Sequence, residues 1–178
     1  MQLLDGDRAG IDSGVFAFTT EFYTEHFVVH AKLTSPERRL SDHLNGSVAS
    51  VDIRPVSALQ LNTGVSAELG RSYAQITKAR ILFVVPVSEP DRPRGQSNAA
   101  WRATSKYCAW AGVGPYSISG TIHTDAGRDP QIALRLLDKQ FLPFTAVTIT
   151  FPDGETQEYP TIIVNRQYLD MLALEAEI

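Results

Sequence analysis

Two stretches of the chain alternate between positions suited to a buried face and positions suited to a wetted face. In the first, every second position is apolar, at Phe27, Val29, Ala31 and Leu33. In the second, serine and threonine separate Tyr116, Ile118, Gly120 and Ile122. Because successive side chains of a strand point to opposite faces, each stretch predicts a β-strand in a sheet that contacts solvent on one side.

The two predicted strands belong to a longer internal repeat. Residues 52–61 match residues 140–149 at an offset of 88 positions, which aligns Pro55 with Pro143. The same offset carries on to the ends of the repeats, and an offset of 89 relates the two alternating strands. An ungapped match over about 35 residues favours a tandem duplication over chance similarity between β-rich segments.

A short helix is predicted after the first strand of each repeat. In the first repeat, residues 35–37 (Ser-Pro-Glu) favour a helix start, Leu40 and Leu44 fall on one face, and Asn45-Gly46 is a natural stop.

In the second repeat, Asp129 can cap a helix that has Pro130 in its first position, where a missing N–H costs nothing. We expect an apolar stripe at helical spacing, formed by Ile132, Leu136 and Leu137.

Three strands are expected after each helix. They span 53–61, 73–77 and 81–87 in the first repeat, and 141–151, 161–164 and 168–174 in the second, where residues 152–154 (Pro-Asp-Gly) turn the chain into 155–159.

The sequence therefore predicts a mostly β or α+β protein. Its expected architecture is a tandem duplication of a small strand-helix-strand-strand-strand unit, folded as a small barrel or roll. The expected segments are an N-terminal extension at 1–25, which could add a strand, repeat one at 26–87, a linker at 88–114 that holds Trp101 and Trp110, and repeat two at 115–178.

Three motifs resemble an uncharacterised bacterial family of small β-rich domains. They are Arg-Leu-Ser-Asp-His-Leu-Asn at 39–45, Phe-Leu-Pro-Phe at 141–144 and Ile-Val-Asn-Arg at 163–166. The last motif, a turn between two strands, also resembles the second half of a bacterial Sm-like barrel. That second resemblance implies ring formation and RNA binding, but the Sm-like binding residues do not map onto this chain. The first repeat departs from the last motif, with Thr77-Lys78 at the turn.

Composition argues against several kinds of function. The 178 residues include 20 acidic and 16 basic side chains, a net charge of −4 that disfavours a general phosphate-binding surface. One cysteine forms no internal disulfide, and four histidines leave little room for a metal cage. We predict no catalytic residue, metal or cofactor.

Two places in the sequence contain residue types that are associated with catalysis, but their surroundings do not indicate a catalytic site. Ser41, Asp42 and His43 are adjacent, so they point in different directions on a helix, and we expect a capping serine and a solvated face. Cys108 lies between aromatic residues, and we expect it to be a buried structural cysteine.

The linker holds the main candidate binding residues. Cations and aromatic rings alternate there, at Arg92, Arg94, Trp101, Arg102, Lys106, Tyr107 and Trp110. Such a mixture suits a protein interface or single-stranded nucleic acid, and the net negative charge favours protein. Packing of the joint between the repeats is the alternative.

A second candidate is the turn at Asn165 and Arg166, which the offset of 88 aligns with Thr77 and Lys78. Two equivalent turns could share a ligand or partner groove. The alternative is an ordinary turn, because asparagine tolerates a left-handed backbone.

The leading functional hypothesis is a non-enzymatic structural or assembly subunit that contacts a protein partner or copies of itself. The alternative is an Sm-like nucleic-acid or small-ligand binding module, and an enzyme would require polar groups that converge from both repeats. We expect a cytoplasmic protein without membrane insertion. The N-terminus is acidic where a signal peptide is basic, and the apolar run at 81–87 is too short to span a bilayer.

Overall fold

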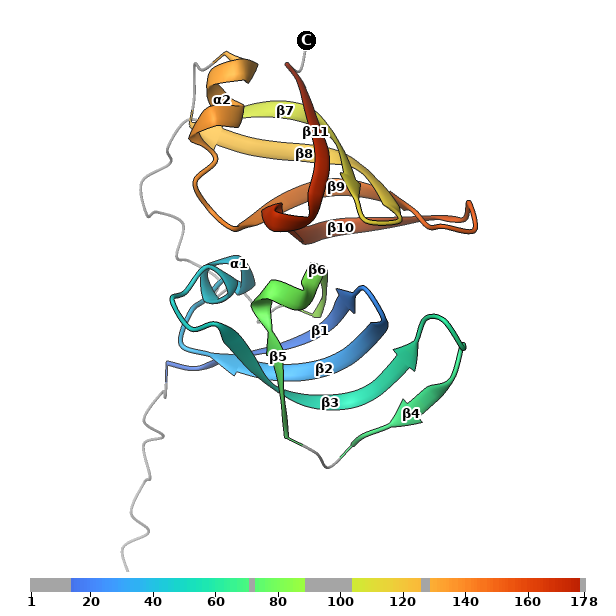
Figure 1. The fold of residues 1–178 in the computed structure, drawn as a ribbon. Helices are drawn as coiled ribbons and strands as arrows, with labels where there is room; N and C mark the ends of the chain where they lie inside the picture. The colour runs from blue at the N-terminus through green and yellow to red at the C-terminus, as the bar shows by residue number, and fades with distance from the viewer. Residues whose placement is uncertain (1–13, 71–72, 89–103, 126–128, 177–178) are drawn as a thin grey trace, which may run out of the picture.

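The computed structural model of the protein describes residues 14–70, 73–88, 104–125 and 129–176. Its first half contains β1 (Phe16–Thr24), β2 (Phe27–Ser35), α1 (Leu40–Leu44), β3 (Ser50–Gln60), β4 (Ser66–Glu68), β5 (Ala74–Thr77), the 3₁₀ turn η1 (Lys78–Arg80) and β6 (Ile81–Ser88). Its second half contains β7 (Thr104–Val113), β8 (Tyr116–Asp125), α2 (Pro130–Leu136), β9 (Phe141–Thr150), β10 (Thr156–Asn165), the 3₁₀ turn η2 (Arg166–Tyr168) and β11 (Leu169–Ala176). We call these halves the N-terminal unit and the C-terminal unit. The mostly β class is confirmed (Figure 1).

The strands form one antiparallel sheet that runs through both units. The order is β11-β7-β8-β9-β10-β6-β1-β2-β3-β4, and β5 also pairs with β3. The order within the C-terminal unit, last strand beside first, recurs in the N-terminal unit as β6-β1-β2-β3. The expected small barrel is wrong in one respect: over the described residues the sheet is open, because its path ends at β11 and at β4.

Each unit begins one strand earlier than the sequence indicated. β1 is the strand that the predicted N-terminal extension could add, and β7 occupies residues 104–113 of the predicted linker, where no strand was expected. Both strands are internal to the sheet, since β1 pairs with β2 and β6, and β7 pairs with β8 and β11. The prediction missed β7 because its solvent-facing positions include cationic and aromatic residues. The buried positions between them alternate regularly, as in any half-buried strand.

The strand ladders refine the internal alignment. Thr77 and Asn165 end equivalent strands, as the offset of 88 requires, but Thr77 pairs with Ser50 whereas Asn165 pairs with Phe141. β3 and β9 are therefore related by an offset of 91 rather than 88. Pro55 is buried and Pro143 is exposed, so these two prolines are not equivalent.

The two helices differ from expectation in detail. α1 begins at Leu40, after the predicted start, while Ser35 still belongs to β2 and its Oγ accepts a hydrogen bond from the Glu37 N–H. Leu40 and Leu44 are buried on one face, as predicted. Ser41 is not the cap, because Arg39 occupies that position without a side-chain bond.

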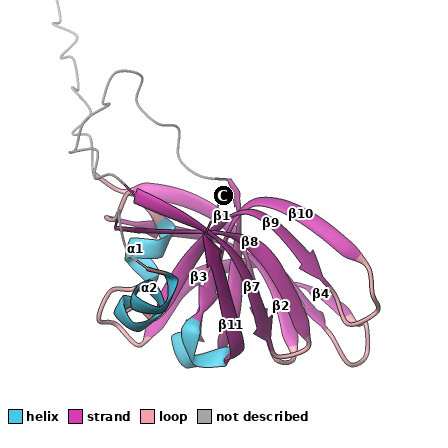
Figure 2. Ribbon diagram, turned by 90° about the horizontal axis from the view of Figure 1, so that it is seen from above, coloured by secondary structure: helices cyan, strands magenta, loops and turns pink. Residues whose placement is uncertain are grey.

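In α2, Asp129 caps the Gln131 N–H at 2.8 Å and Pro130 starts the helix, as predicted. The apolar stripe is wrong at Ile132, which is half-exposed, since Ala133 is the residue that faces the core. Leu137 packs against the core, and the Leu136 side chain lies outside the described residues. Both helices lie at the same end of the strands (Figures 1 and 2).

β6 is the strand that joins two hydrophobic cores. Leu82, Phe83 and Val85 enter the core of the C-terminal unit, while Ile81 and Val84 enter the core of the N-terminal unit. Tyr23 of β1 also packs in the C-terminal core, and residues cross in the other direction too, because Phe141 and Ile163 of the C-terminal unit pack in the N-terminal core. The two units therefore share packing as well as strand pairing.

Phe144 tests the larger core. Its side chain is fully buried in β9, so Phe144→Ala removes a ring and leaves a cavity, and we expect the free energy of unfolding to fall by about 3–5 kcal/mol. Val48→Ala, at a residue 67% exposed, is the control and should change it by less than about 0.5 kcal/mol. Urea denaturation measures both values, and equal losses would contradict the assigned core.

Candidate interaction site: the junction and the two free sheet edges

The units meet where β6 pairs with β10. The ladder contains Ile163 opposite Val84 and Val164 opposite Phe83. These four side chains are almost completely buried. The junction is therefore a piece of continuous sheet whose two faces are covered by the two cores.

Asn165 is the polar centre of this junction. Its side chain is fully buried and its Nδ2 donates to the carbonyls of Lys78, at 3.1 Å, and Ile81, at 2.7 Å, across the unit boundary. Its Oδ1 accepts from the Gln167 N–H at 3.1 Å. A polar side chain this deeply buried is tolerated because each polar atom has a partner.

A second asparagine crosses the boundary from the N-terminal unit to the C-terminal unit. Asn45, at the C-cap of α1, donates from Nδ2 to the Phe141 carbonyl at 2.8 Å and accepts from the Phe141 N–H at 2.9 Å. The Asn45 amide thus forms the pair of hydrogen bonds that a neighbouring strand would form, and both backbone polar groups of Phe141, the first residue of β9, have a partner. In the sequence Asn45 looked like a helix stop only, and nothing in the local pattern indicated a partner almost a hundred positions away.

Lys78 and Arg166, at equivalent turns, have structural partners of their own. Lys78 is buried and its Nζ donates to the Gly46 carbonyl at 2.8 Å, and burial lowers its pKa. Arg166 is exposed, and its guanidinium donates to the Leu137 carbonyl. Both cations therefore bond within their own units, and it is Asn165 that links the predicted turn site across the boundary.

The predicted aromatic and cationic site is divided by β7. Lys106 and Trp110 lie on the outer face, while Tyr107 is buried on the opposite face. The remaining candidates, Arg92, Arg94, Trp101 and Arg102, lie outside the described residues.

Cys108 lies between Lys106 and Trp110 on the outer face of β7, and it is exposed. The prediction of a buried cysteine is wrong, because alternation along β7 points this position to solvent.

Polar residues from neighbouring strands come together at Glu21. The Tyr23 hydroxyl donates to its carboxylate at 3.3 Å, and His30 Nδ1 lies 3.6 Å from its other oxygen. Burial, and then the charge of Glu21, raise the pKa of Tyr23. Glu21 and His30 are directly paired across β1 and β2, so we assign the cluster to strand pairing.

Two hydrogen-bonding edges end the described sheet. β11 pairs on one side with β7, and on the other side no described strand pairs with it. At the opposite end, β4 and β5 pair with β3, and no described strand pairs with their other sides. Unpaired edges are templates for adding another strand.

In the described residues no cluster of three or more His, Cys, Asp or Glu side chains is arranged to hold a metal ion. Nor is either described helix long and apolar enough to cross a membrane. Comparisons with protein-family models, curated proteins and solved structures find no match to this chain.

Asn165 offers a direct test of the junction. Asn165→Ala leaves the Lys78 and Ile81 carbonyls buried without this donor, so we expect the free energy of unfolding to fall by about 2 kcal/mol or more. Asn62→Ala, in an exposed turn, is the matched control and should be nearly neutral. A shared denaturation midpoint for the two variants would contradict the role of Asn165.

His43 predicts a pH dependence of stability. Burial, and next the charge of Lys78, lower its pKa below 6.5, and its Nδ1 lies 3.0 Å from Ser35 Oγ. Between the folded and unfolded pKa values the unfolded chain binds more protons, so stability is lost as the pH falls from about 6.5 toward the folded value. We expect His43→Gln to reduce the loss of unfolding free energy between pH 7 and pH 5. His26→Gln, at an exposed imidazole, is the control, and an equal effect of both variants would contradict this assignment.

Proposed function

We propose that the protein is a non-enzymatic assembly subunit whose partner is a second copy of the same chain. The two free edges of the sheet make the contact, with β11 of one copy lying beside β5 of the next. A cytoplasmic location is part of this proposal and rests on the single cysteine, which forms no intramolecular disulfide.

The observation that carries the proposal is a difference in burial between equivalent strands. The offset of 88 relates β6 to β11 and aligns Phe83 with Met171. Phe83 is 0% exposed because the C-terminal unit covers it, whereas Met171 is 55% exposed. β11 therefore exposes an apolar residue at the position where the equivalent residue of β6 is covered by the C-terminal unit.

The other edge has the complementary form. The same offset relates β10, which receives β6, to β5, and aligns Ile163 with Gln75 and Val164 with Ile76. A hollow of about 470 Å³ lies beside β5, and its lining includes Phe27, Val29 and Ile76. Phe27 is 41% exposed, so an apolar side chain of an incoming strand could be covered there.

The internal junction supplies the register. Because Val84 pairs with Ile163 and Phe83 with Val164, the equivalent contact pairs Leu172 of one copy with Gln75 of the next, and Met171 with Ile76. The contact joins different surfaces of the two copies, so it continues until a ring closes or a filament grows. Ring formation is also what the Sm-like resemblance implies.

Light scattering after size exclusion tests the assembly. We expect masses that are multiples of the 19.6 kDa chain, above a dimer. Met171→Lys with Ala173→Lys places charges on the exposed face of β11, and should give a monomer with an unchanged melting temperature. Ile132→Lys, at a half-exposed residue of α2, is the control and should assemble like the parent. A parent that stays monomeric at every concentration would overturn the proposal.

A cross-link tests the register itself. In a Cys108→Ser background, oxidation should join a Gln75→Cys chain to a Leu172→Cys chain. A Gln75→Cys chain mixed with an Ile132→Cys chain is the control and should give little product across the two positions. Equal yields from both mixtures would reject this register even if the protein assembles.

A further inference from the structure

A straight line of polar side chains crosses the outer face of the N-terminal unit. Ser88 of β6 is opposite Thr19 of β1, Thr19 is opposite Lys32 of β2, and Lys32 is opposite Arg54 of β3. Residues directly opposite each other share a face, so two hydroxyls and two cations lie in one row. Adjacent strands are about 4.8 Å apart, so the row spans about 14 Å.

The two cations of this row are placed against each other. Like charges directly opposite across a ladder destabilise a sheet unless an anion separates them. The nearest acidic residue on the same face of β3 is Asp52, and its Oδ1 accepts a hydrogen bond from Gln75 Nε2 at 2.7 Å. In the part of the chain that the structure describes, no ion pair within 4.0 Å joins Lys32 or Arg54 to a carboxylate.

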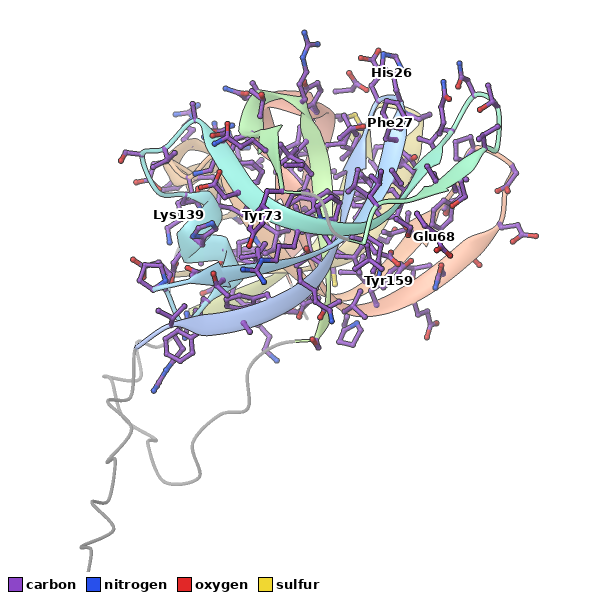
Figure 3. The ribbon with its side chains drawn as sticks, turned by 90° about the horizontal axis from the view of Figure 1, so that it is seen from below. His26, Phe27, Glu68, Tyr73, Lys139 and Tyr159 are labelled. Atoms are coloured by element: carbon purple, nitrogen blue, oxygen red, sulfur yellow. The ribbon has the colours of Figure 1, made fainter. Side chains whose placement is uncertain are left out.

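An aromatic ring completes the row at Arg54. The guanidinium carbon lies 4.9 Å from the centroid of the Tyr73 ring, which orients the cation. Tyr73 is 78% exposed, so its ring is accessible from solvent. Figure 3 views the molecule from this side and shows Tyr73 near the middle of the view.

The row lies in a hollow of about 990 Å³. Its lining includes Thr19, Lys32, Arg54, Tyr73 and Ser88. A volume of this size is at the upper end of the range for small-molecule sites, and a few polar groups that converge in such a hollow determine what it binds. The net charge of the chain is −4, so the attraction for an anion is local to this row.

We propose that this hollow binds a small phosphate ester that carries a planar ring, the chemical class of a nucleoside monophosphate. The guanidinium of Arg54 donates two parallel hydrogen bonds to phosphate oxygens and Lys32 supplies a second charge. The hydroxyls of Thr19 and Ser88 extend the row of donors, and the exposed ring of Tyr73 contacts the planar group. This site is separate from the β11 edge of the proposed assembly, although it borders β5.

Calorimetric titration of the intact chain with adenosine 5′-monophosphate tests the proposal, with adenosine and inorganic phosphate as comparison probes. We expect one site per chain, binding that weakens as salt is raised, and weaker binding of both comparison probes. Lys32→Gln and Arg54→Gln should each lower the affinity for the nucleotide by about tenfold or more, the usual effect of losing a charge-assisted hydrogen bond. Tyr73→Ala should weaken the binding of the nucleotide more than it weakens the binding of inorganic phosphate.

Lys139→Gln is the matched control, because Lys139 is an exposed cation whose Nζ lies 3.7 Å from an Asp42 carboxylate oxygen, outside the hollow. It should bind the nucleotide like the parent, and no variant should melt at a lower temperature than the parent. The proposal is overturned if the parent gives no heat with the nucleotide, or if adenosine binds equally well. It is also overturned if Lys32→Gln and Arg54→Gln bind like the control.

Discussion

The rest of the structure depends on the burial of β6 on both faces. A strand in a small open sheet normally leaves one face to solvent, but Ile81 to Val85 are all buried. This is possible because β1 pairs with β6 on one side, β10 pairs with it on the other, and the cores of the two units cover its faces. Each small unit would be marginal alone, and sharing β6 gives both of them a larger core.

The shared strand also explains why polar groups are buried at the junction. Edge-to-edge joining of two sheets leaves carbonyl and N–H groups of the turns facing each other, and unpaired groups there would cost free energy. Asn165 and Asn45 remove that cost from opposite sides of the boundary. Their hydrogen bonds have a direction, so they also fix how the two units are aligned.

The sequence predicted local structure well where one residue decides the outcome. Asp129 and Pro130 start α2, and Leu40 and Leu44 share the buried face of α1, because capping and helical spacing are local properties. It failed where neighbouring strands decide the outcome. The role of β7, the offset of β3 against β9, and the exposure of Cys108 depend on which strand lies beside which.

The candidate sites show the same limit. The turn at Asn165 was identified as special from its position in the repeat, but its partner atoms on Lys78 and Ile81 belong to the other unit. The row from Ser88 to Arg54 uses four strands that are far apart in the sequence, so no motif contains it. Only the register brings these residues together, and register is set by long-range pairing.

The asparagines also distinguish the junction within the chain from the contact proposed between chains. At the free edge, Thr77 occupies the place of Asn165, and the C-cap of α2 is Leu137 where α1 has Asn45. Thr77 has a shorter side chain without an amide, and Leu137 has no polar group, so a contact between copies lacks both asparagine clamps. Strand pairing and the burial of Met171 remain as its sources of stability. The internal junction therefore has side-chain hydrogen bonds that the proposed contact between copies lacks, and the proposed contact also depends on concentration.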